Sequence, residues 1–133
     1  MDKIYRVDMT NQAVTLEAVP ENYKMLGGRA LIGQIMIDEV DPMCHPIGPN
    51  NKFIIATGLL NGTTAPCSGR LSVGAKSPLT NGIKESNAGG PTATNLAKMG
   101  IKAIIIERDP LGLQEISTES LLHLKMQQKK VIW

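Results

Sequence analysis

The stretch of sequence that decides the fold is KFIIATGLLNGTTAPCSGRLSVGAKSPLTNGIKESNAGG, which runs from Lys52 to Gly90. Strand-like apolar runs alternate in it with loops rich in Gly, Ser, Thr, Asn and Pro. These loops carry many backbone N–H groups and few bulky side chains, which lets a large phosphorylated ligand approach the main chain closely. A single arginine, Arg70, stands in the middle of the stretch.

Strands and turns can be placed within this stretch. Phe53–Thr57 is a short apolar run typical of a buried strand, and Leu71–Ala75 alternates as a second strand does. A long polar loop, Gly58–Gly69, separates them. Ser77–Gly82 contains an Asn-Gly turn of the kind that closes hairpins, so Ile83–Ser86 is expected to return beside the preceding strand.

The residues before this stretch predict a hairpin and a helix. Lys3–Asp8 and Ala13–Ala18 alternate between apolar and polar residues on either side of a Thr10-Asn11 turn, which indicates a β-hairpin. From Glu21 to Val40 the apolar residues fall close to helical spacing. Gly27-Gly28 interrupts that pattern, so we expect the regular helix to begin near these glycines.

The residues after it predict two more helices and a strand. Asn87–Thr92 has the composition of a helix start, with proline just inside, and the helix is expected over Thr92–Met99 with Gly100 as its stop residue. Ala103–Glu107 is typical of a buried strand, and Ser117–Gln128 of a helix. Together the elements predict an α+β fold with a mixed or mostly antiparallel sheet and two or three helices.

Composition limits the classes of function. The 133 residues are expected to form a single domain, 1–133, with 42% hydrophobic residues and 20% charged residues. A net charge of +2 is too small to indicate a nucleic-acid partner. No apolar run approaches the ~20 residues that span a bilayer, and the N-terminus lacks the apolar core of a signal peptide. We therefore expect a cytoplasmic protein with no membrane partner.

The two cysteines, Cys44 and Cys67, do not indicate a redox centre. Neither belongs to a C-x-x-C pair, so a disulfide framework or an iron–sulfur site held by this chain is not expected. Cys44 and His45 are adjacent, but no second pair of metal ligands accompanies them, and we interpret them as loop residues. No catalytic residue is predicted.

Three local motifs each have a functional and a structural interpretation. Arg70 follows a Ser-Gly loop and precedes a strand, and its planar guanidinium suits a phosphate or heterocycle as well as a surface salt bridge. Gly27-Gly28-Arg29 suits an anion at a helix start, although close chain packing is the favoured interpretation. The segment Asn87, Ala88, Gly89, Gly90 suits a phosphate and its counter-cation, or a helix cap formed by Asn87.

Taken together, these segments resemble a known family. GGRALIGQIMIDEV, then IGPNNKFIIATGLLNGTTAPCSGRLSVGAKSPLTNGIKESNAGG, then NLAKMGIKAIIIE resemble the N-terminal domain of the tungsten-containing aldehyde ferredoxin oxidoreductases. The resemblance covers Ile4 to Glu107 and fades after that. It implies a surface that carries a bis-pterin cofactor of tungsten or molybdenum, with the pterin phosphates joined by magnesium.

The resemblance implies roles for particular residues. Arg70 matches the arginine that bridges the pterin and the iron–sulfur cluster. Asn87 matches the asparagine whose backbone carbonyl binds the magnesium ion, and Ala88, Gly89 and Gly90 complete that cofactor-binding segment. The family reaction oxidises an aldehyde to a carboxylic acid and passes two electrons to ferredoxin, with chemistry that the cofactor supplies.

Differences between this sequence and the family change the function that we expect. Leu60 and Asn61 stand where the family has a Pro-Leu-Thr-Gly style of loop, and the family's 4Fe-4S cysteine ligands lie in later domains. We therefore expect a truncated cofactor-cradling domain that is inactive alone and whose partners are the missing C-terminal domains or a partner subunit, and the resemblance leaves open whether this chain alone binds the cofactor. The alternatives are a non-catalytic domain that self-associates as a homo-oligomer, and a stand-alone module for phosphorylated ligands.

Overall fold

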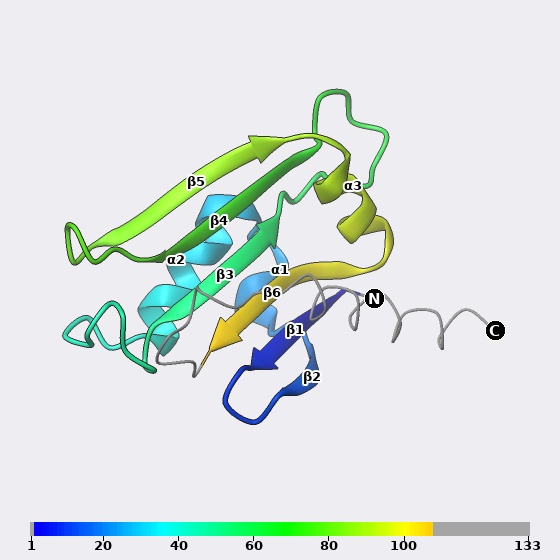
Figure 1. Ribbon diagram of the computed structural model, residues 1–133. Coiled ribbons are helices and arrows are strands. Elements are labelled where there is room, and N and C mark those ends of the chain that lie inside the picture. The colour runs from blue at the N-terminus through cyan, green and yellow to red at the C-terminus, as the bar shows by residue number, and fades with distance from the viewer. Residues whose placement is uncertain (1, 108–133) are drawn as a thin grey trace.

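A computed structural model describes residues 2–107 of the chain, which form one mixed six-stranded sheet and three helices (Figure 1). The strand order across the sheet is β2-β1-β6-β3-β4-β5. The elements, in chain order, are β1 (Lys3–Asp8), β2 (Ala13–Ala18), α1 (Glu21–Lys24), α2 (Gly28–Glu39), β3 (Lys52–Thr57), β4 (Arg70–Lys76), β5 (Ile83–Gly89), α3 (Pro91–Lys98) and β6 (Ile101–Glu107). This architecture confirms the α+β prediction.

The sheet is built from the β1–β2 hairpin and the antiparallel strands β3, β4 and β5, which β6 joins. β1 pairs with β2 and β4 pairs with β5, each antiparallel and each formed by strands close in sequence. β6 then lies between β1 and β3, parallel to β1 and antiparallel to β3. α3 carries the chain from β5 at one edge back to β6, across the end of the sheet (Figure 1). The start of β4 and the end of β5 therefore lie beside α3.

The core lies between the sheet and α2. Alternate strand residues point to this face, and the side chains of Ile4, Ile54 and Ile105 are at most 1% exposed there. They pack against Leu31, Ile32 and Ile35 of α2, which are fully buried. Because aromatic residues make up only 3% of the sequence, aliphatic side chains carry the burial that stabilises this interface.

The opposite face of the sheet, here called the open face, is also apolar. The strand residues that alternate with the core residues point to this face. Its apolar side chains are half-buried rather than buried: Tyr5, Val7, Phe53, Ile55, Leu71, Val73, Ile104 and Ile106. Val14 and Leu16 of β2 continue it and are 48% and 54% exposed. The face is thus apolar from β2 to β4.

A network of charged side chains ties the elements together at the end of the sheet far from α3. Arg6 of β1 contacts three carboxylates, with Nη1 at 2.8 Å from Glu39 and 3.1 Å from Glu107, and Nε at 3.0 Å from Glu17. Lys52 of β3 bridges the same Glu39 and Glu107. Five elements, β1, β2, α2, β3 and β6, are therefore joined by partly buried ion pairs.

Most predicted elements are confirmed, with one correction that matters for the site. The hairpin of β1 and β2, the break at Gly27-Gly28, the turn at Ser77–Gly82 and the stop of α3 at Gly100 lie where expected. However, Asn87 does not begin a helix: β5 continues to Gly89, and Gly90 is the N-cap of α3 without a side-chain cap. The helix predicted over Ser117–Gln128 lies outside the described residues.

Candidate functional site

The backbone of Arg70 is held at the first position of β4 by a side chain from the preceding loop. The amide of Asn61 donates from Nδ2 to the Arg70 carbonyl at 2.7 Å, and Arg70 N–H points back to Asn61 Oδ1 at 3.4 Å. The same N–H also donates to the Ser68 carbonyl at 2.7 Å. Asn61 is 7% exposed, so this contact lies inside the protein although the Arg70 side chain is exposed.

The guanidinium of Arg70 extends over the end of β5. Arg70 lies directly opposite Gly89 in the β4–β5 register, and a Cβ added at Gly89 would stand 4.0 Å from Arg70 Nη1. Arg70 Nε donates to Asn87 Oδ1 at 2.5 Å, and Asn87 Nδ2 donates to Ser72 Oγ at 2.9 Å. Within residues 2–107, Nη1 and Nη2 of Arg70 have no hydrogen-bond acceptor, so they remain free to bind a ligand.

The register of β5 turns the backbone of Asn87 outward. Gly90 N–H donates to the Gly69 carbonyl at 3.0 Å, so Gly69 and Gly90 form a hydrogen-bonded pair of the antiparallel ladder. Hydrogen-bonded and non-hydrogen-bonded pairs alternate from there. The pairs Arg70–Gly89 and Ser72–Asn87 are therefore the non-hydrogen-bonded ones. Because β5 is an edge strand, the carbonyls of Asn87 and Gly89 point away from the sheet. An oxygen-binding cation is able to reach them there.

Glycines keep the start of α3 open and close to β4. Gly90 has φ 137°, a backbone conformation that favours glycine, and no atom lies within 4 Å of a Cβ added to it. A Cβ at Gly69 would lie 3.0 Å from the Gly90 carbonyl and 3.0 Å from Thr94 Oγ1. The first turn of α3 therefore sits beside Arg70 with its N–H groups uncapped by any side chain.

The Gly27-Gly28-Arg29 motif serves packing, as the favoured interpretation predicted. A Cβ at Gly27 would lie 2.4 Å from the backbone nitrogen of Leu59, so only glycine fits there. Arg29 Nε contacts Glu85 Oε2 at 3.2 Å. The Ser72 hydroxyl, and after it the Arg29 guanidinium, lower the pKa of the Glu85 carboxyl below its usual range. Arg29 is thus already paired with a carboxylate of the protein itself.

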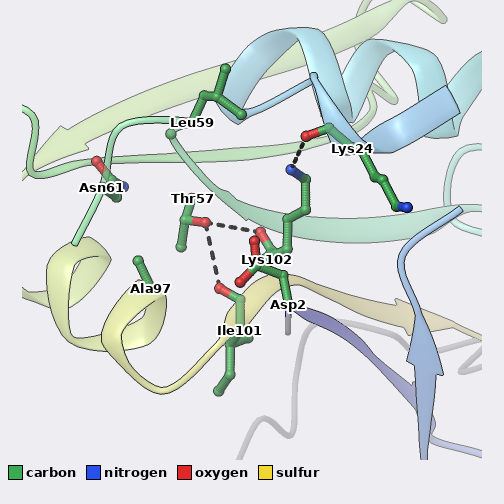
Figure 2. Close-up of a pocket in the computed structure, with 9 residues that line it drawn as sticks. Asp2, Lys24, Thr57, Leu59, Asn61, Ala97, Ile101 and Lys102 are labelled. Atoms are coloured by element: carbon green, nitrogen blue, oxygen red, sulfur yellow. Dashed lines mark hydrogen bonds between the residues drawn. The ribbon is translucent and has the colours of Figure 1, made fainter. Parts of the chain in front are cut away.

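A cavity of about 100 Å³ lies under the loop that carries Asn61 (Figure 2). Lys102 lines it, is 7% exposed and donates from Nζ to the carbonyl of Lys24 at 2.8 Å. Burial lowers the pKa of the Lys102 ammonium, and the negative charge of Asp2 opposes that shift. Since Lys24 ends α1, the Lys102 ammonium serves as a cap for that helix end.

The remaining sequence candidates take structural positions. Cys44 is buried and its carbonyl accepts a hydrogen bond from Lys76, while His45 Nδ1 accepts one from the backbone of Ile47. Cys67 is exposed in the loop before β4. Between residues 2 and 107, no three His, Cys, Asp or Glu side chains gather in a way that would hold a metal ion. None of the helices described is long and apolar enough to cross a membrane.

Sequence reasoning missed Asn61 and Lys102. Because Asn61 precedes Gly62 in a polar loop, the sequence indicates only a turn residue there. In the structure its side-chain amide takes the place of a neighbouring strand as the hydrogen-bond partner of Arg70. Lys102 lies one residue before the expected start of the last strand, which begins at Ile101 in the structure. Lys102 contacts Lys24, which is 78 positions away, and Asn61 contacts Arg70 across nine positions of an irregular loop, so no periodic pattern marks either residue.

Comparison with known proteins gives consistent similarities. Residues 4–114 match the family described as aldehyde ferredoxin oxidoreductase, N-terminal domain. Over 107 residues the chain is 43% identical to the tungsten-containing aldehyde ferredoxin oxidoreductase of Pyrococcus abyssi and 39% identical to that of Pyrococcus furiosus. Each match covers 79% of this chain and 18% of the relative, so the chain spans less than a fifth of the length of these proteins.

A solved structure shares the fold. It is described as the active site complex BamBC of benzoyl coenzyme A reductase in complex with 1,5 dienoyl-CoA. The superposition has a TM-score of 0.75 at 27% sequence identity, and it covers 96% of this chain and 23% of that chain. The arrangement of strands and helices around Arg70 therefore recurs within a much larger protein.

Proposed function

Because the chain belongs to the aldehyde ferredoxin oxidoreductase family through its match to the N-terminal domain, we propose that Arg70 and Asn87–Gly90 form part of a surface that holds a tungstopterin. The observation that carries the proposal is the convergence of these residues. The Arg70 guanidinium, the outward carbonyl of Asn87 and the uncapped start of α3 lie at one corner of the sheet.

The donors and acceptors at this corner fit a phosphorylated pterin with magnesium. The free Nη1 and Nη2 groups of Arg70 suit the polar edge of a pterin or a phosphate oxygen. The carbonyl of Asn87 supplies an oxygen ligand for a hard cation such as Mg²⁺, and the N–H groups of α3 suit a phosphate. Gly89 and Gly90 leave room for a large ligand to approach the backbone.

The metal supplies the redox chemistry when the cofactor is bound, and this chain supplies binding and orientation. We infer that a protein with this domain oxidises an aldehyde and passes the electrons to a ferredoxin-type acceptor, as the family name implies, and that it does so in the cytoplasm through an iron–sulfur cluster. The cluster ligands and the substrate pocket would come from further domains or a partner subunit. The isolated chain of residues 1–133, a single domain in this proposal, would not reduce viologen with aldehydes above an Arg70→Ala control.

A matched pair of arginine variants tests the binding role. A phosphorylated pterin with Mg²⁺ is titrated into the wild-type chain, Arg70→Ala and Arg29→Ala. Both variants remove one exposed guanidinium, but only Arg70 lies at the proposed site, whereas Arg29 contacts Glu85. We expect Arg70→Ala to weaken binding by about 10-fold or more, as the loss of charge-assisted hydrogen bonds does, and Arg29→Ala to leave it unchanged. An equal loss of pterin binding in both variants would contradict the proposal.

Inorganic phosphate provides the second arm of that experiment. If phosphate with Mg²⁺ binds as tightly as the phosphorylated pterin does, the site is a general phosphate module rather than a pterin surface. We expect the pterin to bind more tightly, because the planar Arg70 guanidinium matches a heterocycle edge that phosphate lacks.

A second candidate function is self-association through the open face. Its apolar part, from β2 to β4, is about 19 Å wide for five strands and about 20 Å long for six residues, from ordinary strand spacings. That is roughly 400 Å² in projection, about half of the ~800 Å² per partner in a stable interface. A second copy offers the same apolar surface, so we propose a homo-oligomer when no other domain covers this face.

A further inference from the structure

We propose that Asn61 is a positioning residue for Arg70, because its side-chain amide replaces a strand partner that β3 does not supply. The inference rests on the proposed function, since it affects the ligand only if Arg70 contacts it. Nothing in the local sequence pattern assigns Asn61 such a role.

The β3–β4 register shows which partner is missing. The two strands pair from Ile54 opposite Gly74 to Thr57 opposite Leu71, so the next residue, Gly58, would stand opposite Arg70. β3 ends at Thr57, and the chain turns away. The N–H and C=O of Arg70 point to that side, because Arg70–Gly89 is a non-hydrogen-bonded pair of the β4–β5 ladder.

Asn61 satisfies the backbone group that this turn leaves unpaired. Its Nδ2 donates to the Arg70 carbonyl at 2.7 Å, and its Oδ1 shares the Arg70 N–H with the Ser68 carbonyl. A buried carbonyl without a hydrogen-bond partner destabilises the folded state, so the hydrogen bond from the Asn61 amide is favoured. An asparagine side chain carries a donor and an acceptor on one planar group, as a backbone peptide does.

The turn around Asn61 is rigid enough to act as a fixed point. Asn61 N–H donates to the Gly58 carbonyl at 3.1 Å, and Asn61 itself is 7% exposed. Gly62 follows with φ 79°, and a Cβ there would stand 3.1 Å from Cβ of Ala97 in α3. The amide is therefore anchored between the end of β3 and α3, the helix beside the proposed ligand.

Two contacts then fix the direction of an otherwise exposed arginine. Asn61 holds the backbone at the base of Arg70, and Asn87 Oδ1 accepts from its Nε near the tip. Loss of the Asn61 contact leaves the first residue of β4 free to fray and spreads the guanidinium over several orientations. A pre-positioned group binds more tightly because less conformational entropy is lost.

Amide hydrogen exchange tests the contact without any ligand. Asn61→Asp keeps the shape but removes the Nδ2 donor, and Asn61→Ala removes the whole amide. We expect Arg70 N–H to exchange at least about fivefold faster in Asn61→Ala and by a smaller factor in Asn61→Asp, which keeps an oxygen acceptor for this N–H, while amides in the centre of β3 keep their rates. Thr63→Ala is the control, because it breaks hydrogen bonds of the same loop to Leu60 and Ala65 and none to Arg70. Unchanged exchange at Arg70 in both Asn61 variants would overturn the inference.

A double-mutant cycle with a phosphorylated pterin and Mg²⁺ separates positioning from general stability. In the wild-type background, Asn61→Ala should weaken binding about three- to tenfold. In the Arg70→Ala background, the same substitution should cost nothing more, because the residue it positions is gone. An equal loss in both backgrounds indicates a merely structural role and contradicts the proposal. If the wild-type chain does not bind the pterin, the proposed function fails while the exchange experiment still decides the role of Asn61.

Discussion

Arg70 and Asn87 stand on neighbouring strands two positions apart in register, and Arg70 Nε donates to Asn87 Oδ1. Asn87 also donates to the Ser72 hydroxyl, so its amide lies between the exposed guanidinium and a serine that is 1% exposed. The side chain of Asn87 thereby orients Arg70, while its backbone carbonyl faces outward from the edge of the sheet. One residue thus contributes to the proposed site in two ways.

Removal of the Asn87 side chain tests the first of these contributions. Asn87→Ala should weaken pterin binding about three- to tenfold, because one charge-assisted hydrogen bond that orients Arg70 is lost. The backbone carbonyl remains, so binding of Mg²⁺ with phosphate alone should change little. Titration calorimetry with both ligands measures the two effects. A variant that loses both equally would show that the side chain supports the fold rather than the orientation of Arg70.

Two glycine substitutions test how closely α2 packs on the sheet. A Cβ at Gly74 of β4 would lie 2.6 Å from Cγ2 of Ile32 and 3.2 Å from the Lys84 carbonyl, so Gly74→Ala should destabilise the fold by about 1–3 kcal/mol. At Gly33, within α2, nothing lies within 4 Å, and Gly33→Ala should stabilise by about 0.5–1 kcal/mol. Urea unfolding checks both. A Gly74→Ala variant as stable as the wild type contradicts the packing described.

Acid should weaken the fold through Glu39. Burial raises the pKa of Glu39, but hydrogen bonds from Arg6 and Lys52 outweigh it and hold the pKa below its usual value of 4.5. A carboxyl with a lowered folded-state pKa stabilises the fold fully above its unfolded pKa. That stabilisation is lost as the pH falls through the lowered value.

The free energy of unfolding of Glu39→Gln should therefore change less than that of the wild type when the pH falls from neutrality to below 4.5. Urea unfolding at several pH values gives the comparison. Glu21→Gln, which removes an exposed carboxylate from α1, is the control and should follow the wild type. If Glu39→Gln keeps the full acid sensitivity, the ion network is not its source.

Self-association through the open face predicts a dimer or higher oligomer for the isolated chain. Light scattering at tens of micromolar, the order of magnitude typical of in-vitro association, measures it. Leu16→Lys places a charge on the open face and should shift the chain toward monomer, since Leu16 is 54% exposed there. Ile37→Lys is the control, because Ile37 is 72% exposed on α2, away from that face. A clean wild-type monomer would refute this alternative.

The contrast between sequence and structure follows from the range of the contacts. The hairpin of Lys3–Asp8 and Ala13–Ala18 was predictable because alternation and a turn lie next to each other. The parallel pairing of β1 with β6 joins residues almost a hundred positions apart, and no local pattern specifies it. At Arg70, local residues alone left a salt bridge and a ligand equally open, and it was the resemblance to a family that favoured a ligand.

The extension of β5 shows the same principle on a smaller scale. Asn87, Ala88 and Gly89 have weak strand propensity, and their composition favoured a helix start. The ladder with β4 overrides that propensity and makes them the end of an edge strand. Asn61 was missed for a related reason, since an Asn-Gly pair in a loop predicts a turn but does not reveal which backbone the amide contacts.

Chemical-shift mapping of the wild-type chain with a phosphorylated pterin and Mg²⁺ tests the central claim most directly. The pterin surface proposed here predicts that the largest backbone amide shifts fall at Arg70, at Asn87–Gly90 and in the first turn of α3. The Arg70 Nε–H signal should move as its Nη groups bind the ligand. Shifts that instead fall on the open face, or no shifts at any ligand concentration up to the solubility limit of the pterin, would contradict the claim that this corner of the sheet holds the cofactor.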